Sequence, residues 1–131
     1  MKENKKTVLI VDDDQDYLTQ MEIQVKRLGF NVITADSQKA GEDIINRETV
    51  DLAILDLMME NKDSGFILCY KMKKMNPHLP VIIASAVTAE TGLNFGVETE
   101  ADRSWIKADT FIEKGIRPDQ LEREIHKLLK I

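Results

Sequence analysis

The amino-acid sequence predicts an α/β fold with a five-stranded, parallel, doubly wound sheet and helices on both faces. Short apolar runs alternate with stretches in which apolar residues recur at helical spacing. Several of the runs are apolar throughout, as is typical of parallel strands covered on both faces. Repeated strand–helix units joined by right-handed crossovers then give a doubly wound sheet.

Five runs are predicted to be strands. They are Thr7–Val11, Asn31–Ala35, Asp51–Leu55, Val81–Ser85 and Thr110–Glu113.

Four stretches have apolar residues at helical spacing and are predicted to be helices. Gly29 supplies a stop for the first helix, and Ser37 caps the second. The third ends before Pro77, and Pro118 opens the last. The apolar faces are Leu18, Met21, Val25 and Leu28; Ala40, Ile44 and Ile45; Phe66, Cys69 and Met72; and Leu121, Ile125, Leu128 and Leu129.

The segment Ala86–Asp109 does not follow this alternation. Gly92 and Gly96 interrupt it, and residues 98–103 are almost all polar. We predict an irregular, extended segment after the fourth strand. Long irregular stretches inside a compact domain are uncommon and often functional.

Length and composition indicate one domain, residues 1–131, located in the cytoplasm. The 131 residues, 43% of them hydrophobic, suffice for one buried core. Cys69 is the only cysteine and forms no internal disulfide, and the apolar run before Asp12 is too short for a signal peptide or a membrane span. A net charge of −5 argues against direct nucleic-acid binding.

Charged residues follow three of the predicted strands. Asp12 and Asp13 follow the first strand, Asp56 the third and Lys114 the fifth. The carboxyl ends of parallel strands form the edge where ligands bind. Carboxylates gathered there repel one another unless a cation joins them, and oxygen ligands suit a hard ion such as Mg²⁺. The pattern predicts a metal-assisted phosphoryl site.

Four motifs stand in a particular order along the chain. They are Val8–Asp14, Asp56–Met59 with Asp63–Phe66 after it, Val81–Ala86, and Phe111–Lys114. Together they resemble the receiver domain of two-component response regulators, and the resemblance spans nearly the whole chain. It implies the flavodoxin-like fold of chemotaxis-type single-domain regulators.

The resemblance also implies a function. A receiver takes a phosphoryl group from a sensor histidine kinase or a phosphotransfer protein and changes its surface for a downstream protein partner. It is a phospho-switch rather than an enzyme, although it assists its own Mg²⁺-dependent phosphorylation and dephosphorylation. Neither a membrane nor a nucleic acid is an expected direct partner.

The resemblance assigns a role to each matching residue. Asp56 is the phosphoacceptor, and Mg²⁺ is held by Asp12, Asp13, Asp56 and the backbone carbonyl of Met58. A carboxylate is a competent nucleophile toward phosphorus when its charge and that of the phosphoryl group are screened. Lys114 supplies part of that screening.

Two further residues are assigned to the switch. Ser85 matches the switch hydroxyl and belongs with Asp56 and Lys114 to the catalytic set, whereas Phe111 matches the switch aromatic. Two positions depart from the common pattern of receivers. Glu60 stands where a proline is frequent, and Gly115 follows Lys114 where receivers usually have proline.

Two other functions fit parts of the pattern. In a haloacid-dehalogenase-type phosphatase, Asp12 would be the nucleophile and Asp14 the general acid-base. A phosphorylation-independent docking module would keep the fold without taking up phosphate. A calcium loop is rejected because Tyr17 stands where glycine is needed and Ile23 where a bidentate acid is needed.

Overall fold

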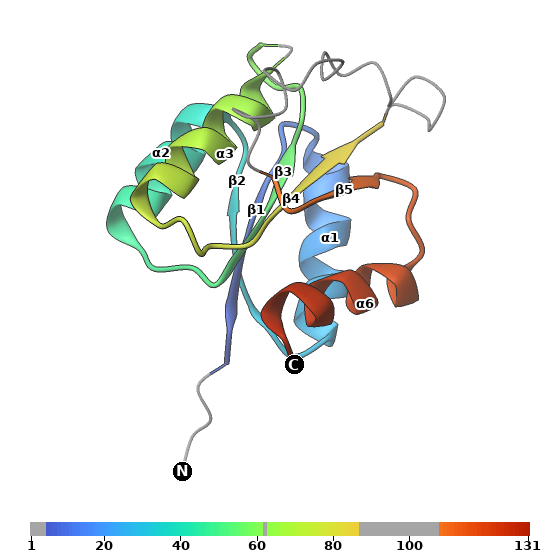
Figure 1. Cartoon of the computed structure of the whole chain (residues 1–131). Coiled ribbons are helices and arrows are strands. Elements are labelled where there is room, and N and C mark those ends of the chain that lie inside the picture. The colour runs from blue at the N-terminus through green and yellow to red at the C-terminus, as the bar shows by residue number, and fades with distance from the viewer. Residues whose placement is uncertain (1–4, 62, 87–107) are drawn as a thin grey trace, which may run out of the picture.

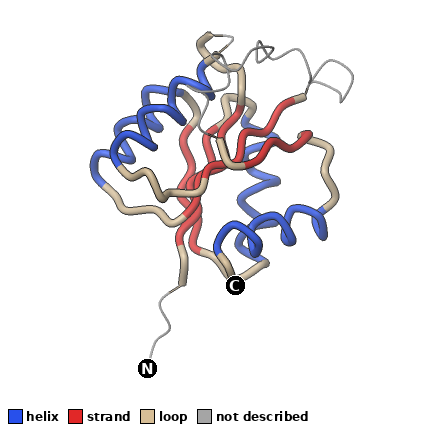
Figure 2. The backbone as a smooth tube through the Cα atoms, viewed as in Figure 1, coloured by secondary structure: helices blue, strands red, loops and turns tan. Residues whose placement is uncertain are grey.

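A computed structural model of the protein describes residues 5–61, 63–86 and 108–131. Its centre is a parallel sheet of five strands in the order β2-β1-β3-β4-β5, which confirms the predicted fold class (Figure 2). The strands are β1 (Thr7–Val11), β2 (Asn31–Ala35), β3 (Leu52–Asp56), β4 (Val81–Ser85) and β5 (Thr110–Glu113).

The third strand begins and ends one residue later than the sequence predicts. Asp56 is its last residue and pairs in register with Ala84 of β4. Asp51 instead precedes the strand, where its backbone N–H donates to the Thr7 carbonyl and its side chain accepts from the Thr7 N–H, at 2.8 Å in both cases.

Helices cover both faces of the sheet (Figure 1). They are α1 (Gln15–Arg27), α2 (Gln38–Arg47), α3 (Ser64–Met75) and α6 (Pro118–Leu129). Helices α2 and α3 lie on one face, and α1 and α6 on the other. None of these helices is long and apolar enough to cross a membrane.

Polar side chains fix where two of the helices start. Asp14 caps α1 by accepting hydrogen bonds from the N–H groups of Asp16 and Tyr17, and Ser37 caps α2 by accepting from Ala40. Of the predicted irregular segment Ala86–Asp109, residues 87–107 lie outside the described residues.

The core consists of two apolar clusters, one on each face of the sheet. Strand β1 contributes to both: Leu9 and Val11 belong to the cluster under α2 and α3, and Val8 and Ile10 to the cluster under α1 and α6. All four side chains are at most 1% exposed. Burial on both faces explains why this strand reads as apolar throughout.

Strand order and register bring the charged residues together. The chain adds β2 to one side of β1 and then β3 to the other, so the crevice of this doubly wound sheet lies between β1 and β3. Val11 pairs with Leu55, which places Asp12 beside Asp56. Ser85 pairs with Glu113, the residue before Lys114.

Gly65 allows the start of α3 to pack directly against the end of β3. Its N–H donates to the Leu57 carbonyl at 2.8 Å. A Cβ atom at Gly65 would clash with the backbone oxygen of Asp56 and would lie 2.8 Å from the Cα of Leu57. Backbone atoms cannot yield as a flexible side chain can, so this position requires glycine.

We predict that Gly65→Ala lowers the free energy of unfolding by about 1–3 kcal/mol, the usual cost of overpacking. Gly115→Ala is the matched control because a Cβ at Gly115 has no neighbour within 4 Å. The control should leave stability unchanged or raise it by about 0.4–1 kcal/mol. Urea unfolding of both variants measures the difference, and equal stability would contradict the close approach.

Candidate functional site

Three carboxylates meet at the carboxyl ends of β1 and β3. Oxygen atoms of Asp12, Asp13 and Asp56 all lie within 4.8 Å of one another. Asp12 is 1% exposed and Asp56 6% exposed, whereas Asp13 faces solvent. The Asp12 backbone N–H donates to the Ala35 carbonyl, and one Asp12 carboxylate oxygen accepts from the Asp14 N–H. These two hydrogen bonds hold Asp12 in place at the end of β1.

The ammonium group of Lys114 lies between the two buried carboxylates. Its Nζ is 2.7 Å from Asp12 Oδ2 and 3.1 Å from Asp56 Oδ1. Burial of the ammonium lowers the pKa of Lys114, but the hydrogen bond to Asp12 and the charges of Asp56 and Asp12 outweigh it, so the net pKa is raised. The backbone N–H of Lys114 donates to the Ser85 carbonyl at 2.9 Å, which ties the lysine to the end of β4. Lys114 therefore stays charged.

The single positive charge of Lys114 does not balance the negative charges of Asp12, Asp13 and Asp56. The pKa of Asp56 is raised to about 7, first because the group is buried and second because of the Asp12 charge, with Lys114 offsetting these effects only in part. The site consequently has a net negative field. An additional cation would favour the charged form of Asp56.

The loop after β3 carries Met58, whose side chain is 48% exposed. The N–H of the preceding Leu57 donates to the Ala84 carbonyl at 3.1 Å. Further along the loop, Glu60 accepts hydrogen bonds from the backbone N–H groups of Gln38 at 2.9 Å and Lys39 at 3.4 Å. A side chain of this loop thus caps the start of α2.

The residues assigned to the switch lie on the neighbouring strands. Ser85 ends β4 and is 5% exposed, one residue beyond the partner of Asp56. Phe111 of β5 is 43% exposed, and its ring meets that of Phe66 edge to face with 6.1 Å between the centroids. Ser85 therefore lies at the end of the strand that neighbours Asp56, and Phe111 is partly exposed beside Phe66.

Two residues that contribute to this region, Tyr17 and Glu60, could not be identified from the sequence. Tyr17, in the first turn of α1, places its ring centroid 4.7 Å from Lys114 Nζ. Glu60 departs from the family pattern, and that pattern does not indicate its contact with the start of α2. The one sequence signal for it is that the first turn of α2 has no acidic residue of its own.

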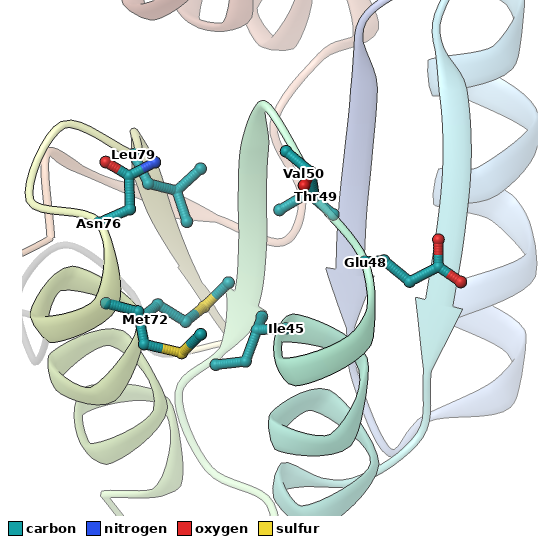
Figure 3. Close-up of a pocket in the computed structure, with 8 residues that line it drawn as sticks. Ile45, Glu48, Thr49, Val50, Met72, Asn76 and Leu79 are labelled. Carbon is teal, nitrogen blue, oxygen red and sulfur yellow. The ribbon is translucent and has the colours of Figure 1, made fainter.

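A separate cavity of about 160 Å³ lies between α2 and α3, where Met72 and Ile45 project toward each other (Figure 3). It contains none of the charged residues above. Its lining is Ile45, Glu48, Thr49, Val50, Met72, Met75, Asn76 and Leu79.

A family model described as the response regulator receiver domain matches residues 8–126. The chain belongs to this family. The family match confirms the resemblance read from the four motifs: this receiver is a phospho-switch module of two-component signalling. It also excludes the haloacid-dehalogenase alternative.

Curated relatives of this receiver include transcriptional regulators. It is 40% identical to GlrR of Escherichia coli over 79 residues, which are 60% of this chain and 18% of GlrR. It is 29% identical to the probable transcriptional regulator ycf27 of Cyanophora paradoxa over 130 residues, which are 99% of this chain and 51% of that protein. The chain thus spans about half or less of the length of these relatives.

Solved structures share the fold of this receiver. A CheY-like receiver from Methanospirillum hungatei has a TM-score of 0.80 at 24% identity, covering 97% of this chain and 95% of that one. TrrA from Thermotoga maritima, in complex with Mg²⁺ and BeF, has a TM-score of 0.77 at 23% identity. The match covers 94% of this chain and 98% of TrrA. At these identities the likeness concerns the fold.

The raised pKa of Asp56 predicts how stability depends on pH without divalent cations. Its folded pKa of about 7 lies above the ordinary 3.8, so the folded state binds the proton more tightly. The free energy of unfolding should therefore fall as pH rises from about 4 to about 7. Asp56→Asn should lose less stability over that window, as measured by urea unfolding in the presence of a chelator.

Asp119→Asn is the control for this measurement. A hydrogen bond from Arg117 lowers the pKa of the exposed Asp119 below its ordinary value, so this residue remains ionised throughout the upper part of the window. The control should lose stability with rising pH as the wild type does. An equal loss in Asp56→Asn and wild type would show that Asp56 does not cause it.

Proposed function

We propose that Asp56 of this receiver accepts a phosphoryl group from a sensor histidine kinase or a phosphotransfer protein, with Mg²⁺ and Lys114 screening the charge. The observation that carries the proposal is the Lys114 ammonium, 2.7 Å from Asp12 and 3.1 Å from Asp56, at the end of β3. In this arrangement a nucleophilic carboxylate lies beside a fixed positive charge and two further acids. Phosphoryl transfer depends mainly on such positioning and charge stabilisation.

The donor set fits Mg²⁺. Asp12, Asp13 and Asp56 offer only oxygen ligands, within 4.8 Å of one another, and hard cations prefer oxygen. We infer that the backbone carbonyl of Met58 completes the protein ligands. When bound, the ion would neutralise negative charge that develops on the transferred phosphoryl group.

The chain's own residues carry the transfer step. A carboxylate oxygen of Asp56 forms a bond to phosphorus as the bond from phosphorus to the donor nitrogen breaks, and the donor imidazole leaves with the electron pair. Lys114 then pairs with an oxygen of the phosphoryl group in place of the Asp56 oxygen. Asp12 keeps its contact with Lys114, so the ammonium remains in the site.

The switch would follow from the new acceptor oxygens. An aspartyl phosphate offers strong acceptors to nearby hydroxyl donors, and Ser85 lies at the end of the adjacent strand. We infer that the Ser85 hydroxyl moves toward the phosphoryl group and that the exposed Phe111 ring fills the space vacated. The surface near β4 and β5 would change for a downstream protein.

The same groups would assist loss of the phosphoryl group to water, but slowly. Met58, two residues after Asp56, has a thioether that cannot orient an attacking water as a polar side chain would. Val87, which takes the corresponding position after Ser85, lies outside the described residues. The signal would therefore be lasting rather than brief.

The remaining partners and the location follow from charge and family. Response regulators interact with histidine kinases and downstream effectors. With a net charge of −5, this domain is proposed to act through protein contacts and not to bind nucleic acid or a membrane directly. The proposed location is the cytoplasm.

We predict that phosphoramidate and Mg²⁺ transfer one phosphoryl group per chain and that Asp56→Asn abolishes this uptake. Asp63→Asn is the matched control, because Asp63 precedes α3 in the same loop and its side chain makes no capping hydrogen bond. Intact-mass spectrometry with mapping of the modified residue measures both. Uptake in Asp56→Asn at the wild-type level would refute the assignment, and no uptake by folded wild type would favour the docking module.

We predict that Mg²⁺ at ten times its dissociation constant raises the free energy of unfolding by about 1.4 kcal/mol. Binding relieves the repulsion between the carboxylates. Asp13→Asn should lose most of the gain at the same Mg²⁺ concentration, whereas the control Asp43→Asn, in α2 beside Lys39, should keep it. Chemical unfolding with Mg²⁺ or a chelator measures the gain, and a wild type indifferent to Mg²⁺ would rule out the metal site.

A further inference from the structure

Tyr17 contacts the lysine of the phosphorylation site from the side of α1. Its ring centroid lies 4.7 Å from Lys114 Nζ, the atom that also contacts Asp12 and Asp56. An ammonium over the face of an aromatic ring is attracted by the ring quadrupole, more strongly when water is excluded. The Lys114 side chain is only 19% exposed, so this contact is largely shielded from solvent.

The hydroxyl of Tyr17 is buried and forms no hydrogen bond with any residue in the described parts of the chain. Burial raises the pKa of this phenol, and the charges of Asp12 and Asp56 raise it further. The group is therefore a protonated donor in the field of the same two carboxylates. A buried donor without an acceptor is costly and calls for an explanation.

We propose that Tyr17 is a positioning residue of the phosphorylation site, whose ring holds the Lys114 ammonium and whose hydroxyl donates to an acceptor brought by phosphorylation. This inference rests on the proposed function of Asp56. Lysine has a flexible four-carbon stem, so contacts with two carboxylates alone leave the ammonium some freedom to move. The ring of Tyr17 adds a third contact to the ammonium.

The ring also suits a lysine that must change partners. During transfer the ammonium leaves Asp56 Oδ1 for an oxygen of the phosphoryl group. The attraction of a cation to an aromatic face depends little on direction compared with a hydrogen bond, so the ammonium can shift while remaining against the ring. Tyr17 thus restrains Lys114 without fixing it to the unphosphorylated arrangement.

The other tyrosine of this chain provides a matched control. Tyr70, in α3, has Lys74 Nζ 5.7 Å from its ring centroid. Tyr70 is 39% exposed, and its pair with Lys74 includes neither Asp12 nor Asp56. Substitution there removes the same kind of contact away from the phosphorylation site.

The first experiment tests the contact without phosphate or Mg²⁺. In protein with ¹³C-labelled lysine, the ring face should shift the ε-methylene protons of Lys114 upfield, with the signal assigned by its loss in Lys114→Gln. Tyr17→Phe should keep the shift and Tyr17→Leu should abolish it, while Tyr70→Leu leaves it unchanged. An unshifted Lys114 signal in wild type would overturn the positioning role, whatever becomes of phosphorylation.

The second experiment measures the rate of Asp56 phosphorylation by phosphoramidate and Mg²⁺. Loss of the ring in Tyr17→Leu should slow it about five- to tenfold, as expected for a partly desolvated cation–aromatic contact. Tyr17→Phe should phosphorylate at nearly the wild-type rate but lose its label faster, because only the hydroxyl contact with the phosphorylated state is gone. Tyr70→Leu should match the wild type in both respects.

A double substitution separates positioning from general damage to the fold. In a Lys114→Gln background, Tyr17→Leu should change the rate less than about twofold, since the partner of the ring is already absent. An equal slowing with and without Lys114, or an equal slowing by Tyr70→Leu, would overturn the proposal. The wild type could fail to take up a phosphoryl group while the upfield shift of the Lys114 protons persists. That result would refute the proposed function of Asp56 but retain the contact between Tyr17 and Lys114.

Discussion

The shared contact of the Lys114 ammonium with Asp12 and Asp56 sets the constraint that the rest of the structure has to satisfy. Two buried carboxylates and one ammonium leave uncompensated negative charge, and burying charge is unfavourable unless it is fully paired. The raised pKa of Asp56 reflects that deficit. The site therefore does not hold itself together; the surrounding fold must impose it.

Apolar packing around the strands imposes it. Leu9 and Val11 pack on one face of β1 and Val8 and Ile10 on the other, so Asp12 leaves the sheet at a fixed point. Most of the free energy that holds the carboxylates close comes from burial of such side chains, since hydrophobic burial is the dominant favourable contribution to folding. The acidic site can therefore remain short of positive charge, a property that favours binding of a cation.

The sequence was sufficient for the fold and for the residues at the strand ends because both depend on local pattern. Apolar runs predicted the strands to within one residue, and position after a strand predicted that Asp12, Asp56 and Lys114 would meet. Contacts between side chains of distant segments leave no such pattern. The contact of Tyr17 becomes visible only when α1 is placed beside Lys114, and that of Glu60 only when α2 is placed beside the loop.

The loop beside the site is attached to the fold at two places, Gly65 and Glu60, and the two attachments differ in strength. At Gly65 the backbone of α3 touches the backbone of β3, a contact that cannot relax without moving an element. The carboxylate of Glu60 is slightly desolvated, which raises its pKa. Hydrogen bonds from the Gln38 and Lys39 N–H groups have the larger effect, so the net pKa of Glu60 is lowered. An exposed charge at a helix N-terminus contributes only about 0.3–1 kcal/mol. The loop that carries Met58 is therefore fixed firmly where α3 meets β3 at Gly65 and held only weakly where Glu60 meets the start of α2.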